Sequence, residues 1–324
     1  MREIKITENE AEQRLDRFVR KLLKDTSLKN IYKYIRIGAI KVNGKKVKEN
    51  YSLQNNDLIS LYLKDSYTET NIRKSYKEIK IIYEDKNIMI IDKPVGLLCH
   101  PESNKDKDTL VQRVLGYLER TGGIEESFTF TPALCNRLDR NTLGLVIAAK
   151  NYNSLKSVNE MIRNKGLTRY YLCVVKGKTN DKGEIYGNIS KDNDKKLAYL
   201  NQSEGKKSHT KYIKLADNDK YSLLKVELLT GRFHQIRVHL ATIGHPIVGD
   251  IKYGDSDVNL YFKKKYGLHY QFLIAHSLQF NKITKSLDYI KERAWYSKIP
   301  EVYSVILGDL FGDAENLIKI DVII

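Results

Sequence analysis

Two short segments of the sequence carry side chains that could do chemistry together. In the first, a single carboxylate, Asp139, lies between Arg137 and Arg140. Neighbouring cations keep a partly buried carboxylate ionised, and an ionised carboxylate suits a nucleophile or a base better than a proton donor. The same three residues could equally form a structural ion pair on a loop, so this segment does not identify a reaction by itself.

The second segment, residues 229–240, is dense in polar groups. Between Arg232 and His239 it holds two arginines, two histidines and a glutamine, at the apolar-patterned start of a predicted helix. Such groups can meet a phosphate and the edge of a base. A loop punctuated by glycines follows, from Gly244 to Asp250. The segment therefore indicates contact with a nucleic acid.

Several common sites are excluded because their motifs are missing. A phosphate-binding loop needs a glycine five residues before Gly177, where this chain has Leu172. The dinucleotide, zinc-protease, Cys-x-x-Cys and serine-hydrolase patterns are absent. His234, His239 and His245 are close in sequence, but no cysteine or carboxylate joins them at ligand spacing. The sequence therefore predicts neither a metal nor an organic cofactor.

The composition describes a basic protein with a sizeable core. The chain has 324 residues, of which 41% are hydrophobic, and 56 Lys and Arg against 40 Asp and Glu give a net charge of +16. No run approaches 18 apolar residues, and the N-terminus MREIKITENE lacks an apolar signal segment, so we expect no membrane span. Cys99, Cys135 and Cys173 are odd in number and widely spaced, which argues against a disulfide framework. We therefore expect a cytoplasmic protein with a polyanionic partner.

The basic excess is concentrated near the N-terminus. Residues 14–48 hold 12 lysines and arginines and only two acidic residues, Asp16 and Asp25. The last 24 residues reverse the sign, with five acids against Lys319. A codon bias toward lysine would not produce this asymmetry. The distribution favours an anion-binding face in the first part of the chain.

Apolar spacing predicts how the basic segment folds. Asn9 and Glu12 are placed as a capping box for a first helix, and two apolar rows with helical spacing follow. The rows are Leu15, Phe18, Val19, Leu22 and Leu23, then Leu28, Ile31, Tyr32 and Ile35. Asn43-Gly44, between Ile40 and Val47, predicts a tight hairpin turn because both turn positions need a positive φ. We expect two short helices and a β-hairpin with basic outer faces.

The remainder of the chain has a different texture. From residue 79, strand-like apolar runs occur with helical patterns near 109–120 and 151–164. The strand-like runs are Ile79–Tyr83, Ile88–Ile91, Gly144–Ala149, Tyr171–Val175 and Leu223–Leu228. We therefore predict an α+β protein with a small module over 1–66, a polar linker over 67–78 and one larger domain over 79–324.

Two parts of the sequence resemble known families. The runs RLDRFVRKLL and IRIGAIKVNGKKV are similar to the S4-type RNA-binding module of a small-subunit ribosomal protein and of several RNA-modifying enzymes. Residues 80–280 resemble the RluA-type RNA pseudouridine synthases through four motifs in order. The motifs are Ile82–Leu97, Asn136–Thr142, Arg169–Gly177 and Thr230–Leu240. The chain departs from the family at Asn136, which is usually His, and at Leu143, which is usually Ser or Gly.

The resemblance implies a fold, a reaction and three catalytic residues. The implied catalytic domain is a mixed, mainly antiparallel sheet with flanking helices, and the implied reaction converts uridine to pseudouridine without a cofactor or a metal. Asp139 would be the essential carboxylate, and Arg237 would pair with it. Tyr171 would lie under the uracil and remove the C5 proton, with Tyr170 as the alternative. If these tyrosines form a strand, side-chain alternation places only one of them in the site.

The resemblance also implies contacts with structured RNA. Arg137 would enter the RNA stack as the uridine flips out. Further contacts are expected from Arg140, Arg232, His234 and Gln235 and, in the N-terminal module, from Arg14, Arg17, Arg36, Lys41 and Lys45. Relatives with such a module act mostly on large-subunit ribosomal RNA, which is therefore the expected substrate. We expect the enzyme to be a monomer.

The sequence leaves the mechanism and one other function open. Asp139 could attack C1′ of the ribose or abstract the 2′ proton. A non-catalytic RNA-binding or ribosome-assembly protein could retain the same fold, although the presence of Asp139 favours the enzyme. A nucleoside hydrolase is disfavoured because its cluster of metal-binding aspartates is absent.

Overall fold

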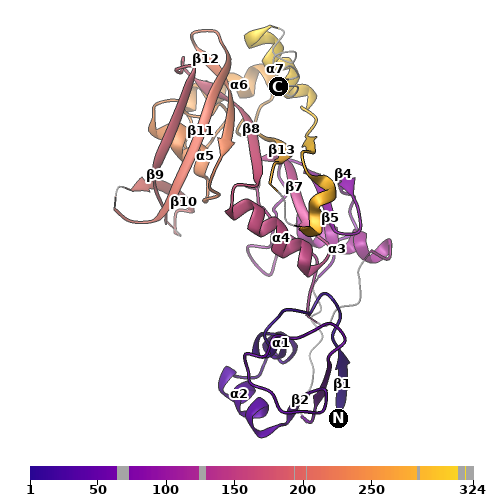
Figure 1. The fold of residues 1–324 in the computed structure, drawn as a ribbon. Helices are drawn as coiled ribbons and strands as arrows, with labels where there is room; N and C mark the ends of the chain where they lie inside the picture. The colour runs from indigo at the N-terminus through magenta and orange to yellow at the C-terminus, as the bar shows by residue number, and fades with distance from the viewer. Residues whose placement is uncertain are drawn as a thin grey trace.

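The protein folds into two lobes, each with its own hydrophobic core. The computed structural model describes residues 1–63, 73–123, 129–192, 194–201, 203–282, 285–312 and 318. Figure 1 shows the N-terminal module, in indigo, apart from a larger body that carries the rest of the chain. The module's core lies between Ile4 and Leu61, and the larger body's clusters share none of its residues. Of the predicted linker, residues 67–72 lie outside the described part of the chain.

The N-terminal module packs two helices against a small antiparallel sheet. Its elements are β1 (Arg2–Lys5), α1 (Leu15–Leu22), α2 (Leu28–Ile37), β2 (Ile40–Val42) and β3 (Leu58–Leu61). The strands pair in the order β1-β3-β2. α1 buries its predicted apolar row, whereas α2 buries Ile31 and Ile35 and leaves Leu28 and Tyr32 exposed. The basic side chains are therefore left on the outer faces of both helices.

The predicted start of the first helix is wrong. Glu12 takes a left-handed φ of 63°, and the helix begins at Leu15. Asn9 does not cap it, because its side-chain oxygen accepts a hydrogen bond of 3.1 Å from the backbone N–H of Tyr152 in the larger body. A contact between the lobes has replaced the local cap.

The predicted hairpin is reduced to its turn. Asn43 and Gly44 have φ values of 51° and 73°, as the turn requires. The residues after the turn form only a bridge from Lys45 to Val42, and β2 pairs with β3 instead. The side chain of Asn43 explains the choice, because its oxygen accepts a 2.8 Å hydrogen bond from the backbone of Leu58 at the start of β3.

The larger body is built on a sheet of 11 described strands. They are β4 (Lys80–Glu84), β5 (Ile88–Lys93), β6 (Ala133–Leu134), β7 (Leu143–Ala149), β8 (Leu167–Lys176), β9 (Lys182–Asp192), β10 (Leu197–Asn201), β11 (Lys206–Asp217), β12 (Tyr221–Leu228), β13 (Leu273–Phe280) and β14 (Ala294–Tyr296). The order is β10-β9-β11-β12-β8-β13-β7-β5-β4, with β14 on β13 and β6 on β7. Only β7 and β13 pair in parallel among these strands. The predicted mixed, mainly antiparallel sheet is confirmed.

Helices cover both faces of this sheet. They are α3 (Leu110–Arg120), α4 (Tyr152–Arg163), α5 (Gln235–Thr242), α6 (Ser256–Tyr266), α7 (Glu301–Phe311) and the 3-10 helix η1 (Lys285–Ile290). Alternate residues of a strand point to opposite faces. On β8, Tyr171 and Cys173 pack with α3 and α5, whereas Leu172 and Val174 pack with α6 and α7. None of the described helices is long and apolar enough to cross a membrane.

The parallel pair β7–β13 requires a glycine. Gly144 has a φ of 113°, and a Cβ atom there would lie 2.3 Å from the carbonyl oxygen of Ala275. A side chain at this position would push the two strands apart. Leu143, one of the departures from the family pattern, starts β7 and is buried with α6 and α7. That departure therefore belongs to the core on the side away from α5.

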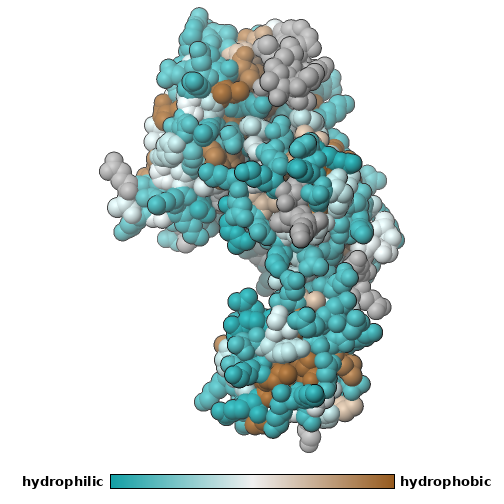
Figure 2. Space-filling view, viewed as in Figure 1, coloured by the Kyte–Doolittle hydropathy of each residue, from teal (hydrophilic) through white to brown (hydrophobic). Residues whose placement is uncertain are grey.

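The two lobes meet through a few polar contacts. Lys156 on α4 forms a 2.7 Å ion pair with Glu12, and Lys21 Nζ lies 5.5 Å from the ring centroid of Tyr152. Figure 2 shows the narrow junction between the lobes and the mostly hydrophilic surface on both sides of it. An exposed ion pair of this kind contributes at most about 1 kcal/mol. The described contacts therefore join the lobes weakly.

Candidate active site

The loop between β6 and β7 holds Asp139. The backbone N–H of Thr142 donates to the carbonyl of Asp139 at 3.1 Å and closes a turn. Leu138 is buried in the core, while Arg137 and Arg140 on either side of the turn are exposed. The side chain of Asp139 is 20% exposed. The loop thus points one carboxylate inward and two arginines outward.

Lys93, at the end of β5, fixes this loop through hydrogen bonds to backbone carbonyls. Its ammonium donates to the carbonyls of Pro94, Leu97 and Arg140 at 2.9, 2.8 and 3.0 Å. Burial lowers the pKa of Lys93 to about 8, although the nearby Asp139 carboxylate acts in the opposite direction. Three backbone acceptors occupy its donors, so Lys93 has a structural role in the loop.

Asn136 fixes the same loop to β7. Its side-chain oxygen accepts from the N–H of Ile147 at 2.8 Å, and its amide nitrogen donates to the carbonyl of Leu145 at 3.3 Å. Through these two hydrogen bonds the side chain of Asn136 pairs with the backbone of β7 as a neighbouring strand would. The second departure from the family pattern therefore still anchors the loop that carries Asp139.

Arg237 on α5 joins two carboxylates. Its NH1 donates to Asp139 Oδ2 at 2.9 Å, while Nε and NH2 form a fork to Asp250 at 2.7 and 2.8 Å. Arg237 is 5% exposed and the Asp250 side chain is fully buried. Burial alone would lower the pKa of Arg237, but the hydrogen bond and charge of Asp250, with Asp139, raise it. Because a guanidinium is planar and rigid, Asp250 sets the direction in which NH1 points.

His234 approaches the same oxygen of Asp139. It precedes α5 with a left-handed φ of 54°, and its Nε2 lies 3.7 Å from Asp139 Oδ2. Burial lowers the pKa of His234 to about 4; Asp139 opposes this effect, and the charges of Arg237 and Lys252 add to it. The imidazole is therefore neutral near pH 7. The hydrogen bond that Asp139 accepts from Arg237 is made by Oδ2, and no described residue hydrogen-bonds Oδ1.

Tyr171 lies on the same side of the sheet. It is buried, and burial raises its pKa to about 12, with Arg169 opposing and Asp139 adding to the shift. Its resting form is the neutral phenol. Tyr170 points to the other face, where the Lys225 ammonium lies 4.4 Å from its ring centroid. Strand alternation thus puts Tyr171, and not its neighbour, beside Asp139.

These groups suit one kind of chemistry. An ionised carboxylate held by a buried cation, beside a neutral imidazole and a phenol, can stabilise a cation-like carbon or take up a proton. Among the described residues, no group of three or more His, Cys, Asp or Glu is placed to hold a metal ion.

Family models match the part of the chain that carries this site and the N-terminal module. A family model for RNA pseudouridylate synthase matches residues 87–242, which include Asp139, Tyr171 and Arg237, and an S4 domain model matches residues 13–59. An uncharacterized RNA pseudouridine synthase of Aquifex aeolicus is 34% identical over 250 residues, covering 75% of this chain and 77% of its own length. The chain belongs to the RNA pseudouridine synthase family. Its predicted membership and its predicted S4-type module are confirmed.

Two further relatives extend the comparison. The ribosomal large subunit pseudouridine synthase C of Haemophilus ducreyi is 31% identical, over 85% of this chain and 86% of its own length. The solved structure of human RNA pseudouridylate synthase domain containing 4 has a TM-score of 0.55 at 23% identity, covering 70% of this chain and 91% of that one. The sequence relatives support an isomerase, and the solved structure shows a shared fold.

The predicted RNA contacts of this pseudouridine synthase differ in their surroundings. Arg137 and Arg140 are exposed, and Arg232 is half-buried, with its Nε donating to the carbonyl of Lys207 at 2.9 Å. Gln235 is 3% exposed, and its amide is used within the protein. Its partners are Thr230, Arg232, His209 and Thr210. The position of Gln235 therefore supports a structural role and does not support the expected RNA contact.

The predicted basic contacts of the S4-type module lie mostly at its surface. Arg14, Arg17, Arg36 and Lys45 are exposed, while Lys41 is half-buried with its ammonium 5.3 Å from the ring centroid of Tyr62. Arg14 is also paired with Asp16 at 2.8 Å. A hollow of about 240 Å³ on this surface is lined by Arg14, Asp16, Arg17, Arg20, Leu28 and Tyr32.

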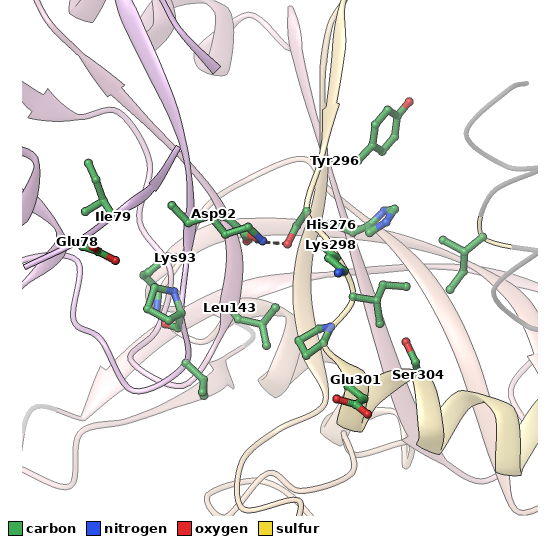
Figure 3. Close-up of a pocket in the computed structure, with 17 residues that line it drawn as sticks. Glu78, Ile79, Asp92, Lys93, Leu143, His276, Tyr296, Lys298, Glu301 and Ser304 are labelled. Atoms are coloured by element: carbon green, nitrogen blue, oxygen red, sulfur yellow. Dashed lines mark hydrogen bonds and ion pairs between the residues drawn. The ribbon is translucent and has the colours of Figure 1, made fainter. Parts of the chain in front are cut away.

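A separate cleft lies on the other side of the sheet. Figure 3 shows its lining residues, which come from β4, β5, β7, β13, β14, α7 and the segments next to them and surround about 1580 Å³. At its edge, Asp92 accepts hydrogen bonds from Ser297 at 2.7 Å and from Lys80 at 2.6 Å. Lys93 lines this cleft and also holds the Asp139 loop. The cleft contains none of the three predicted catalytic residues, so it is not the candidate active site.

Asp250 and Tyr253 are residues of the site that sequence reasoning missed. The glycine-punctuated loop ending at Asp250 was noticeable, but nothing in its spacing relates it to Arg237. The relation arises because Val248 in this loop donates to the carbonyl of Val174 on β8, which brings the loop back under α5. A buried carboxylate after such a loop is a signal only once the sheet is known.

Proposed function

We propose that this protein converts uridine to pseudouridine in large-subunit ribosomal RNA, with Asp139 as the reacting carboxylate and without a cofactor. The observation that carries the proposal is the 2.9 Å contact from Arg237 to Asp139 beside the buried Tyr171. At this distance the guanidinium holds the carboxylate by charge as well as by a hydrogen bond. That carboxylate can stabilise the cation-like ribose formed when the N1–C1′ bond breaks.

Asp139 can act by either of two routes. In the first, a carboxylate oxygen bonds to C1′ as the N1–C1′ bond breaks, and uracil leaves with the electron pair. In the second, the carboxylate removes the 2′ proton as uracil leaves, and it later returns that proton to C2′. In both routes the uracil then turns and C5 bonds to C1′. In the first route this step displaces the carboxylate, whose bond to C1′ breaks and returns the electron pair to its oxygen. The proton on C5 then passes to a base, and N1 gains a proton in its place. Because the uracil is detached midway, the site must exclude water and hold the base.

Tyr171 is the residue that we assign to the uracil. Its buried ring would pack against the base, and its oxygen is the proposed acceptor of the C5 proton. The phenol must lose its own proton before it can accept another, and burial, which raises its pKa to about 12, opposes that step. Arg137, exposed two residues before Asp139, would fill the space that the flipped uridine leaves in the RNA stack.

The S4-type module supports the choice of RNA. Its exposed arginines and lysines can neutralise phosphates along a structured RNA. The relatives from Haemophilus ducreyi and Buchnera aphidicola are each named ribosomal large subunit pseudouridine synthase C, and we propose the same substrate class here. We expect a single chain to act in the cytoplasm, where it meets ribosomal RNA.

The first prediction tests the role of Asp139. Asp139→Asn keeps the size of the side chain and removes its charge, so pseudouridine formation in a large-subunit RNA fragment should fall by more than about a thousandfold. RNA affinity should remain close to that of the parent, because the basic module is unchanged. Asp181→Asn, which alters a carboxylate that is 92% exposed, is the matched control and should retain full activity.

Two results would contradict the proposal. Full activity of Asp139→Asn would exclude the proposed mechanism. Unchanged pseudouridine maps of ribosomal RNA from cells lacking the protein, together with a defect in ribosome assembly, would identify a non-catalytic RNA-binding protein instead.

A further inference from the structure

His234 is held in a conformation that aims its ring at Asp139. Its φ of 54° is left-handed, which costs a non-glycine residue free energy, and histidine tolerates it better than most. Phe233 stacks on the imidazole with centroids 3.7 Å apart, and Tyr253 meets it edge-on at 5.5 Å. The ring therefore has one orientation, with Nε2 toward Asp139 and Nδ1 toward Tyr253.

The hydrogen bonds of Tyr253 determine which nitrogen of His234 carries the proton. The backbone N–H of Ala198 donates to the Tyr253 oxygen at 2.7 Å, so this oxygen is already an acceptor. The same oxygen lies 2.8 Å from His234 Nδ1. A phenol has a single proton, and among the described residues Nδ1 is the acceptor within reach of it. Tyr253 therefore donates to Nδ1, which places the imidazole proton on Nε2.

The surroundings of Nε2 favour the same tautomer independently. Nε2 lies 3.7 Å from Asp139 Oδ2. With the proton on Nδ1, a nitrogen lone pair would face a carboxylate oxygen, and the two would repel each other. With the proton on Nε2, an N–H dipole faces that oxygen and is attracted to it. Both ends of the ring thus select one neutral form.

We propose that Tyr253 is a positioning residue that holds His234 as the Nε2–H tautomer, so that His234 and Arg237 together draw Asp139 Oδ2 and leave Oδ1 to react. His234 is then a fixed neutral donor and not a general base, because Tyr253 occupies its only lone pair. The separation of 3.7 Å exceeds a hydrogen bond. We expect it to shorten when a uridine fills the site and the carboxylate turns toward the ribose.

The role of Oδ1 rests on the proposed function of Asp139, whereas the tautomer does not. The tautomer is read in the full chain labelled with 15N-histidine, by long-range proton–nitrogen correlation near pH 7. The His234 signals are assigned by their loss in His234→Asn, a residue that tolerates a left-handed φ and carries an N–H donor. We expect a protonated Nε2 and an unprotonated Nδ1 in the parent.

Tyr253→Phe should remove the preference of His234 for the Nε2–H tautomer. In this variant the Nε2–H tautomer is no longer the sole form, and kcat on an RNA fragment falls about tenfold with KM unchanged, because one hydrogen bond to a charged group is weakened. Tyr186→Phe is the matched control: this exposed tyrosine also stacks on a histidine, His209, with centroids 4.0 Å apart, and its loss should change neither readout. His234→Asn should keep more activity than His234→Ala.

Three outcomes would overturn the inference. They are an Nδ1–H tautomer or an imidazolium in the parent near pH 7, a Tyr253→Phe spectrum and kcat equal to those of the parent, and equal activities of His234→Asn and His234→Ala. The parent spectrum keeps the inference testable even if Tyr253→Phe folds poorly. If the parent shows the Nε2–H form while Asp139→Asn remains active, the proposed function fails and the tautomer assignment stands.

Discussion

At the scale of single residues, the candidate site depends on how a buried arginine is shared. Arg237 has five N–H donors, and Asp250 takes two of them in a fork while Asp139 takes a third. Asp250 Oδ1 also accepts from the backbone N–H groups of Lys252 and Tyr253. One buried carboxylate thus orients the cation that faces Asp139 and anchors the chain that carries Tyr253. Asp250 is a positioning residue in this scheme.

The second prediction concerns Asp250→Asn. The amide group of Asn would place an N–H donor against a guanidinium donor. The buried charge of Arg237 would also lose the negative charge of Asp250, which provides most of its compensation. We expect kcat to fall by on the order of a hundredfold, because Arg237 is no longer held in the single orientation that points at Asp139. We also expect the free energy of unfolding to fall by about 3 kcal/mol. Single-turnover kinetics and denaturant unfolding measure the two effects.

The control for Asp250→Asn is Asp219→Asn. Asp219 also pairs with a cation, Lys178, at 2.9 Å, but its side chain is 83% exposed. An exposed pair contributes little, so this variant should match the parent in both measurements. A fully active and fully stable Asp250→Asn would show that Arg237 is oriented without its fork.

The sequence indicated the three residues proposed for catalysis but missed the residues that support them. Asp139, Arg237 and Tyr171 came from motifs and lie together, although their chemical roles are still proposals. The surroundings of Gln235 were beyond such reasoning, since its four partners come from β11 and from the turn before α5. Asp250 could not be predicted either. Its contact with Arg237 depends on how two loops cross the sheet, and such a contact produces no recognisable spacing of residues in the sequence.

At the scale of elements, α5 is held on the sheet by buried polar groups as well as by its apolar residues. His239 is fully buried, and its Nε2 lies 2.8 Å from the hydroxyl of Ser208 on β11. Its Nδ1 is buried and has no hydrogen-bond partner in the described structure. Burial lowers the pKa of His239 to about 4, and the nearby His209 adds to this effect. Protonation of His239 would therefore work against the packing of α5.

The third prediction is an acid sensitivity of folding that depends on His239. Its ordinary pKa of 6.5 applies in the unfolded chain, whereas the folded protein binds the proton only near pH 4. Between these values the unfolded state binds more protons, so the free energy of unfolding falls as the pH falls from about 6.5 to 4. Carboxyl groups also titrate near pH 4, so the test compares variants rather than relying on the parent alone. His239→Gln should show a slope of unfolding free energy against pH that is smaller by up to about one proton.

The control for the pH experiment is His269→Gln. His269 is exposed, so its replacement should leave the slope unchanged. Denaturant unfolding at several pH values between 4 and 7 gives the three slopes. Equal slopes for His239→Gln and the parent would mean that His239 is protonated at no cost in the folded protein.

Most of the strands that were predicted correctly are largely buried on both faces, although the half-buried β4 was also predicted and the buried β13 was missed. β5, β7, β8 and β12 appear in the sequence as apolar runs because helices cover the sheet on each side of them. β9 and β11 were missed because one of their faces is open to solvent and carries polar groups such as Glu184, Tyr186 and Lys211. Their hydrophobic signal is confined to alternate residues such as Ile185 and Tyr212. The predicted cap at Asn9 failed for a different reason, since its partner lies in the other lobe.

At the scale of the whole molecule, charge and chemistry are separated. The S4-type module carries 12 basic residues against two acidic ones over residues 14–48, whereas the candidate site is centred on the contact between a buried arginine and a carboxylate. Few described contacts join the two lobes, and the ion pair between them is exposed. We therefore expect the module to set RNA affinity and the larger body to set the rate of the chemical step.

The last prediction measures this division through salt dependence. Each protein–phosphate contact releases counterions, so the logarithm of the binding constant falls with the logarithm of the salt concentration. Arg17→Gln/Arg20→Gln removes two exposed cations from α1 without altering its buried face. The slope should become shallower by about 0.7 to 0.9 for each phosphate that the variant no longer neutralises. kcat at saturating RNA should not change, because neither residue lies near Asp139.

The matched control removes the same charge from the other lobe. Lys263→Gln/Lys264→Gln alters two exposed lysines on α6, on the face of the sheet opposite α5. If net charge alone governed binding, both double variants would lower the slope equally. If the module is the docking surface, only Arg17→Gln/Arg20→Gln will do so, and a slope that matches the parent in that variant would exclude α1 from the RNA interface. A lower kcat in the same variant would show instead that docking also orders the site, in which case the two lobes act as one unit during the chemical step.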